Sequence, residues 1–73
     1  MKKVLIKNWK ENFDKVLFTN IQMELLNIGL KRAKNNTDTL IDSESLIIEM
    51  EDNIINSFKE KIKDSVDVFI VIN

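Results

Sequence analysis

Three short apolar runs in the chain predict β-strands. The first, residues 4–7, is rich in β-branched side chains, which favour strands. Successive side chains of a strand point to opposite faces. In the second run, residues 46–50, this alternation gives one face Leu46, Ile48 and Met50. In the third run, residues 66–72, it assigns to the core face Val66, Val68, Ile70 and Ile72.

Helical spacing predicts a first helix soon after the first strand. The apolar side chains that recur at i, i+3 and i+7 are Phe18, Ile21 and Leu25. Asp14 can accept hydrogen bonds from the free N–H groups of the first turn, so we expect the helix to begin at Lys15. Four side chains should look partly outward, namely Val16, Thr19, Asn20 and Met23.

The stretch IGLKRAKNNTD, residues 28–38, predicts a second helix that follows at once in a tight helix hairpin. Asn27 is a good N-cap for it, and Leu30 and Ala33 fall on its inner face. We expect residues 35–38 to stop this helix, because all four side chains compete for backbone hydrogen bonds. The chain would then turn before the second strand.

A third helix is predicted between the second and third strands. Asp52 can cap it, Phe58 and Ile62 recur at fourfold spacing, and lysines near its end suit the helix dipole. The order is therefore strand, helix, helix, strand, helix, strand. We expect a single domain, residues 1–73, of the α+β class, with a three-stranded antiparallel sheet and three helices packed on one face.

Composition argues against catalysis. The 73 residues include no cysteine and no histidine, which removes thiolate ligands, disulfides and the commonest general base. The serines Ser43, Ser45 and Ser57 thus have no histidine to activate them. An acidic cluster, Glu49, Glu51 and Asp52, could bind a hard cation, but strand-end and helix-start positions explain these residues adequately. We expect no enzyme activity, no cofactor and no metal.

The apolar runs are too short to form a secretory leader or a membrane-spanning helix. The first run is shorter than the roughly 7 to 15 residues of a secretory leader's apolar region, and none approaches the roughly 20 residues of a membrane span. We therefore expect a cytoplasmic protein with no membrane partner.

Charge is divided along the chain although the net charge is only −1. Residues 1–34 hold eight basic and three acidic side chains, a balance of +5, while residues 35–73 hold three and nine, a balance of −6. These charges either solvate two separate faces or mark a binding surface. Nucleic acid is not the expected partner, since the total charge is slightly negative and no stacking platform is evident.

The segment GLKRAK followed by NNTD resembles a segment of the C-terminal domain of the bacterial ribosomal stalk protein. The similarity extends, less tightly, to VLIK as a first strand, KVLF as the start of a first helix, and FKEKIK as a third helix. The resemblance implies the same fold. It also implies that the first two helices capture a partner protein, namely a translational GTPase or ribosome-associated protein, through Lys15, Val16, Lys31 and Lys34.

This chain departs from the stalk pattern in several places. Where that family offers an isoleucine, a lysine and an arginine on the first helix, this chain has Thr19, Asn20 and Met23. Losing two positive charges should slow encounter with an acidic partner. The stalk's dimerisation domain and hinge are absent from the sequence, so we expect its terminal domain used alone. The fold also resembles the Clp-protease adaptor, whose amino-group pocket needs a histidine that this chain lacks.

Two further surfaces are candidates for binding. Trp9 and Phe13 lie in a polar segment and either anchor a partner or fold back as a lid over the core. On the sheet face away from the helices, we expect an apolar patch of Leu5, Ile47, Phe69 and Val71. This face, or an unpaired strand edge, could support a homodimer.

The sequence therefore predicts a small, non-enzymatic interaction domain that docks its basic helix hairpin onto a partner protein. The alternative is a self-associating structural protein that uses the apolar outer sheet face.

Overall fold

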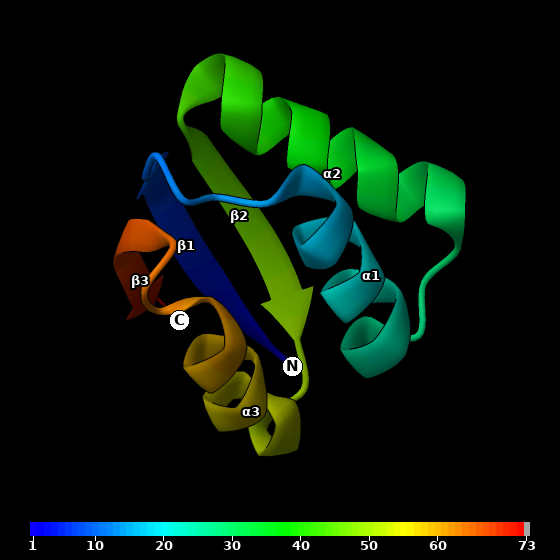
Figure 1. Cartoon of the computed structure of the whole chain (residues 1–73). Helices are drawn as coiled ribbons and strands as arrows, with labels where there is room; N and C mark the ends of the chain where they lie inside the picture. Colours follow the sequence, from blue (N-terminus) through cyan, green and yellow to red (C-terminus); the bar gives the residue numbers. More distant parts are fainter. Residues whose placement is uncertain (73) are drawn as a thin grey trace.

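The computed structural model describes residues 1–72, and its elements follow the predicted order (Figure 1). They are β1 (Lys2–Trp9), α1 (Lys15–Leu26), α2 (Leu30–Ser43), β2 (Ser45–Met50), α3 (Asp52–Ile62) and β3 (Val66–Val71). This is the predicted α+β fold with a three-stranded antiparallel sheet. No helix in this part of the chain has the length and apolar character needed to cross a membrane.

The sheet has the strand order β2-β1-β3, with β1 antiparallel to both neighbours. β1 is therefore the central strand, and β2 and β3 are edge strands. α3 carries the chain from one edge to the other, past β1. The three helices lie together on one side of the sheet (Figure 1). The side chains that β1 and β2 bury against them include Val4, Ile6, Leu46, Ile48 and Met50.

Aromatic rings connect the helices within the core. Phe18 of α1 and Phe58 of α3 are both almost completely buried and meet edge to face, with centroids 6.0 Å apart. Phe13 packs on Phe18 at 5.3 Å, and Phe69 of β3 packs on Phe58 at 6.2 Å. Such pairs add to the stabilisation that burial of their large apolar area provides. The run of rings therefore spans the core from the segment after β1 to the edge strand β3.

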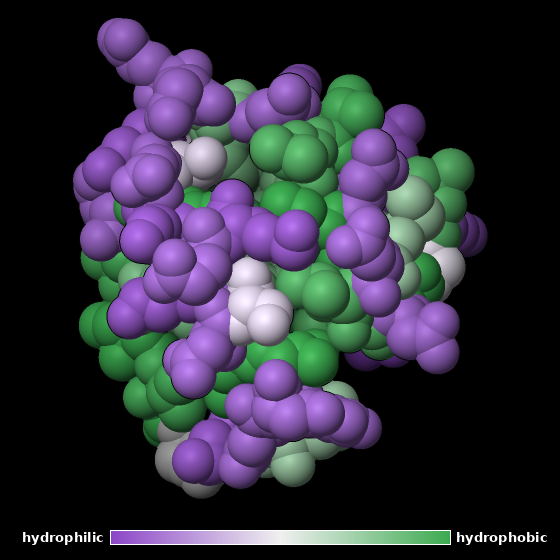
Figure 2. All heavy atoms as spheres, turned by 60° about the horizontal axis from the view of Figure 1, so that its bottom comes forward, coloured by the Kyte–Doolittle hydropathy of each residue, from purple (hydrophilic) through white to green (hydrophobic). Residues whose placement is uncertain are grey.

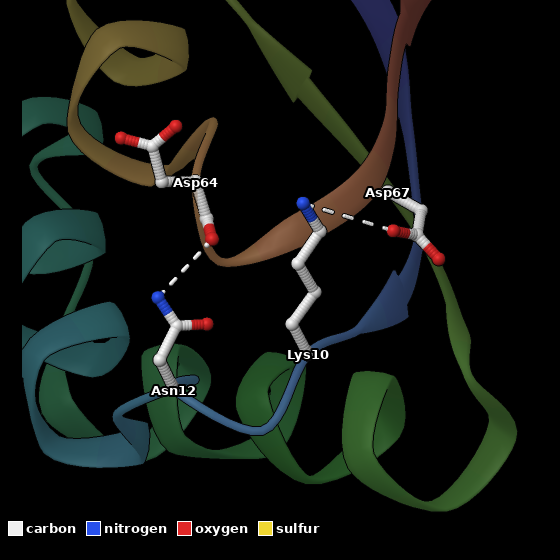
Figure 3. Close-up of polar contacts among 4 residues, drawn as sticks. All are labelled: Lys10, Asn12, Asp64 and Asp67. Carbon is white, nitrogen blue, oxygen red and sulfur yellow. Dashed lines mark hydrogen bonds and ion pairs between the residues drawn. The ribbon is translucent and has the colours of Figure 1, made fainter.

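The segment after β1 is joined to the start of β3 by backbone and side-chain contacts (Figure 3). The Lys10 N–H donates to the Ser65 carbonyl at 2.8 Å, and Asn12 Nδ2 donates to the Asp64 carbonyl at 3.2 Å. Lys10 Nζ lies 3.9 Å from Asp67 Oδ1. These contacts hold the chain entering α1 against the turn that leads into β3.

The second helix begins later and runs further than predicted. Asn27 is the left-handed C-cap of α1, with φ 56°, and Gly29 is the N-cap of α2. Residues 35–38 lie inside α2 rather than ending it. The reason is that Thr37 is buried and its hydroxyl donates to the Ala33 carbonyl at 3.0 Å, so its hydrogen-bonding group is satisfied within the helix.

The face assignment of β3 was wrong by one residue. Ile6 pairs with Phe69 and Val4 with Val71, so Phe69 and Val71 share the helix-covered face with these two buried residues. Their neighbours on the uncovered face, opposite Lys7 and Leu5, are Val68 and Ile70.

The burial of Val66 accounts for this error. Val66 is buried at the start of β3, although alternation places it on the same face as Val68 and Ile70, and Ile70 is 51% exposed. A buried residue at the end of the strand therefore does not identify the covered face of its centre.

Helix capping gives a stability test with an internal control. Asp14 Oδ1 accepts from the Leu17 N–H at 3.0 Å, as predicted, whereas the N-cap of α3 is Glu51 rather than the predicted Asp52 and makes no side-chain cap bond. We expect Asp14→Ala to lower the free energy of unfolding by about 1 kcal/mol, because N–H groups of the first turn lose their acceptor.

Urea unfolding of both variants measures this difference. Glu51→Ala should cost clearly less than Asp14→Ala, and equal losses would contradict the cap assignment.

Candidate functional site

An open groove of about 330 Å³ lies between α1 and α2. Its lining residues are Lys15, Val16, Thr19, Asn20, Leu30, Lys34, Thr37 and Asp38. Three of the four residues that the stalk resemblance implies, Lys15, Val16 and Lys34, thus line one surface feature. Lys31 is exposed on α2 but does not line the groove.

The groove combines exposed apolar side chains with positive charge. Val16 is 70% exposed on α1 and Leu30 is 60% exposed at the start of α2. Lys15 and Lys34 stand among the same lining residues with one carboxylate, that of Asp38, so the lining has a net positive charge. Apolar surface of this kind, bordered by polar groups, is typical of interaction sites. The groove can therefore accept an apolar side chain while its lysines attract a neighbouring carboxylate.

Leu30 was missed as a surface residue. Helical spacing placed it beside Ala33 on the inner face, yet Ala33 is buried and Leu30 is not. Leu30 is the first residue of α2, directly after the N-cap Gly29, so no preceding turn of helix covers it. The predicted start, with Asn27 as N-cap, placed Leu30 inside the first turn, whereas α2 begins at Leu30 itself.

The two helices that form the groove are joined beneath it by buried polar side chains. The hydroxyls of Thr19 and Thr37 are 2.8 Å apart. Gln22 is completely buried, and its Nε2 donates to Thr37 Oγ1 at 3.0 Å and to the Ala33 carbonyl at 3.1 Å. Asn36 Nδ2 donates to Gln22 Oε1 at 2.9 Å. Within residues 1–72, every buried side-chain nitrogen and oxygen has a partner.

Thr19 is thus buried rather than outward-looking as predicted. Its hydroxyl also lies 2.8 Å from the Lys15 carbonyl, one turn earlier in α1. Thr19, which suggested an exposed face, and Asn36 and Thr37, which suggested a helix stop, thus take part in the contact between α1 and α2. This contact fixes the distance between α1 and α2, and with it the width of the groove.

A second hollow, of about 270 Å³, opens where α1 ends and α3 begins. Figure 2, which turns the lower side of Figure 1 forward, shows apolar surface between hydrophilic side chains on this side of the molecule. The lining includes Leu25, Leu26 and Ile54, with the carboxylates of Glu49 and Glu51. Its charge is opposite to that of the first groove, and it contains none of the residues that the resemblance implies.

Trp9, the last residue of β1, and Phe13, in the segment that follows, fold back on the protein. Trp9 Nε1 donates to the Ile41 carbonyl at the end of α2, at 3.2 Å, and the ring lies 6.4 Å from that of Phe13. Phe13 is partly buried against the core. These contacts favour the lid over the partner anchor.

The uncovered sheet face carries a different apolar patch from the predicted one, with Val68 and Ile70 in place of Phe69 and Val71. Leu5 lies between Ile47 on β2 and Ile70 on β3, as their cross-strand partner. Ile47 is 55% and Ile70 51% exposed. Phe69 and Val71 do not belong to this face, because they pair with Ile6 and Val4 on the covered face. Self-association through this face remains a prediction.

Some of the charged residues outside the groove form surface pairs. Lys63 Nζ donates to Glu60 Oε1 at 3.1 Å, and this bond raises the pKa of Lys63 above its usual value. Lys2 Nζ lies 3.7 Å from Asp52 Oδ2. Across residues 1–72, acidic side chains nowhere gather in a group of three that could hold a metal ion.

Comparison with known protein families, with curated proteins and with solved structures finds no match to this chain.

The Gln22 contact can be tested by removing its hydrogen-bonding groups at nearly constant length. We expect Gln22→Met to lower the free energy of unfolding by about 1–3 kcal/mol. The reason is that the groups on α2 that bond to the Gln22 amide, at Ala33, Asn36 and Thr37, lose that hydrogen-bond partner. Urea unfolding measures the loss.

Asn20→Ala is the matched control, since Asn20 is exposed on the same helix. We expect it to change stability by less than about 0.5 kcal/mol. A Gln22→Met variant as stable as the wild type would show that the network does not hold the helices together.

Proposed function

We propose that the chain is a small, non-enzymatic protein-interaction domain that docks the α1–α2 groove onto a partner protein. The observation that carries this proposal is the exposure of Val16 and Leu30 in a groove that Lys15 and Lys34 also line. Apolar side chains that stay in water on two adjacent helices gain free energy when a partner covers them. The lysines add attraction at a distance and favour an acidic partner.

The complementary ligand is a protein segment that presents an apolar side chain next to carboxylates. The apolar group would contact Val16 and Leu30, and the carboxylates would lie near Lys15 and Lys34. Lys31 is exposed on α2 but does not line the groove, so it would act by long-range attraction rather than by contact. The resemblance of GLKRAK to the stalk segment supports a translational GTPase or a ribosome-associated protein as this partner.

A second candidate function is self-association of a structural protein through the uncovered sheet face. The row Ile47, Leu5 and Ile70 supports it. This row is narrow, since the next central-strand residues on the same face, Lys3 and Lys7, are charged. Ile70→Asp, rather than a change at Phe69, is the substitution that separates this function from groove docking.

Groove docking can be tested with purified translational GTPases in their GTP-bound form. We expect Val16→Asp to weaken binding about tenfold or more, because a charge replaces apolar contact at the groove. Reversing two charges, in Lys15→Glu with Lys34→Glu, should weaken binding by a similar factor and reduce the difference in affinity between about 50 mM and about 300 mM salt. Isothermal titration calorimetry gives both quantities.

The matched control is Lys59→Glu with Lys61→Glu, which makes the same change in net charge on exposed residues of α3. It should leave binding nearly unchanged. Equal weakening by both double variants would show that net charge, rather than the groove, determines affinity. Absence of binding by the wild type would reject this partner class.

A further inference from the structure

The outer edge of β3 has backbone groups without a partner in the sheet. β3 pairs with β1 alone, and Figure 1 shows it at the margin of the sheet with no helix beyond it. The Ile72 N–H donates to the Lys3 carbonyl at 2.9 Å. Because the backbone groups of successive strand residues point to opposite sides, those of Asp67, Phe69 and Val71 point away from β1. Within residues 1–72 these outward groups form no other hydrogen bond.

The side chains of β3 do not protect this edge. Natural proteins guard an edge strand with lysine, proline, a bulge or an inward charge. Residues 66–71, VDVFIV, include no lysine and no proline, and their single charge is Asp67. That carboxylate is already near Lys10 of its own chain (Figure 3). Val71, at 43% exposure, adds apolar surface beside the open backbone groups.

The other edge strand, β2, is protected by charge. The Asn8 N–H donates to the Glu44 carbonyl, so alternation turns the groups of Ser45, Ile47 and Glu49 outward. In two β2 edges paired about Ile47, Glu49 of each copy would face Ser45 of the other, and Glu44 lies directly before each Ser45. Carboxylates of both copies would then gather at each end of the interface with no basic side chain on β2 to balance them, and their repulsion disfavours that pairing. Self-pairing is therefore favoured at β3 and not at β2.

We propose that β3 pairs antiparallel with β3 of a second copy of this chain, about a two-fold axis at Phe69, to form a continuous six-stranded sheet. The occupant follows from the symmetry of the edge. Its three outward residues are evenly spaced about Phe69, so an antiparallel copy presents donors and acceptors at matching positions. In this register Asp67 faces Val71 of the second copy, and the two Asp67 carboxylates stay apart.

This pairing would extend the aromatic contacts of the core across the interface. Phe69 is partly buried, and its ring packs on Phe58. Pairing at Phe69 would place the second copy's Phe69 beside it on the same face of the sheet. The aromatic contacts of each core would then join through the edge strands. None of the β3 residues lines the α1–α2 groove, so this interface and groove docking are independent.

Amide hydrogen exchange on the wild-type chain tests the proposal residue by residue. Protein concentration is raised from about 10 μM to about 1 mM, where interfaces of less than standard size associate, and sedimentation equilibrium follows the mass. We expect a monomer–dimer equilibrium. Exchange at Asp67, Phe69 and Val71 should slow at least tenfold at the high concentration, while Val68 and Ile70, bonded to β1, stay protected at both.

A pair of substitutions at one exposed position tests the register. Val71→Asp would face Asp67 of the second copy with a like charge and should weaken dimerisation at least tenfold. Val71→Lys removes the same apolar side chain but would face that carboxylate with an opposite charge, and should retain dimerisation. Thermal unfolding of each variant checks that the fold is kept.

Three results would overturn the proposal. The first is a monomer throughout the concentration range. The second is a dimer in which the amides of Ser45, Ile47 and Glu49, rather than those of β3, become protected. The third is a dimer with no newly protected strand amides, which would instead indicate association through the uncovered sheet face. Equal weakening by Val71→Asp and Val71→Lys would overturn the register centred on Phe69.

Discussion

The buried carboxamide of Gln22 is the contact on which the helical half of this protein depends. It joins the backbone of α2 at Ala33, the hydroxyl of Thr37 and the amide of Asn36. A buried amide is costly unless its groups are bonded, so α1 and α2 can pack closely only in the one arrangement that satisfies them all. That arrangement leaves Val16 and Leu30 on the outside and creates the groove between the helices. Specific packing of a small domain here comes from polar groups as well as from the apolar core.

Much of the architecture follows from local patterns in the sequence. The order of elements, the inward face of β2 and the Asp14 cap are all determined by residues within one or two turns of one another, so periodicity and capping preferences predict them. The resemblance to the stalk domain pointed to Lys15, Val16 and Lys34, and these residues line the same groove. The role of that groove in binding is still a proposal, since geometry alone does not identify a partner.

The remaining features depend on residues far apart in the chain. The sequence NNTD looks like a helix stop until Thr37 meets Thr19 and Gln22, which belong to another helix. The faces of β3 depend on its register with β1, which pairs Phe69 and Val71 with the buried Ile6 and Val4. Leu30 is exposed because α2 begins at that residue. The residue pattern within one strand or one helix does not predict these features, because they depend on contacts between elements.

The strand order also determines how this chain must fold. β1 lies at the centre of the sheet, yet Val4 pairs with Val71, which is 67 positions later (71 − 4 = 67). The α1–α2 hairpin can form from neighbouring residues, whereas the sheet closes only when the two ends of the chain meet. Closing so long a loop costs entropy before the paired strands return any stabilisation. We therefore expect the search of the last strand for the first to limit the folding rate, although the protein is short.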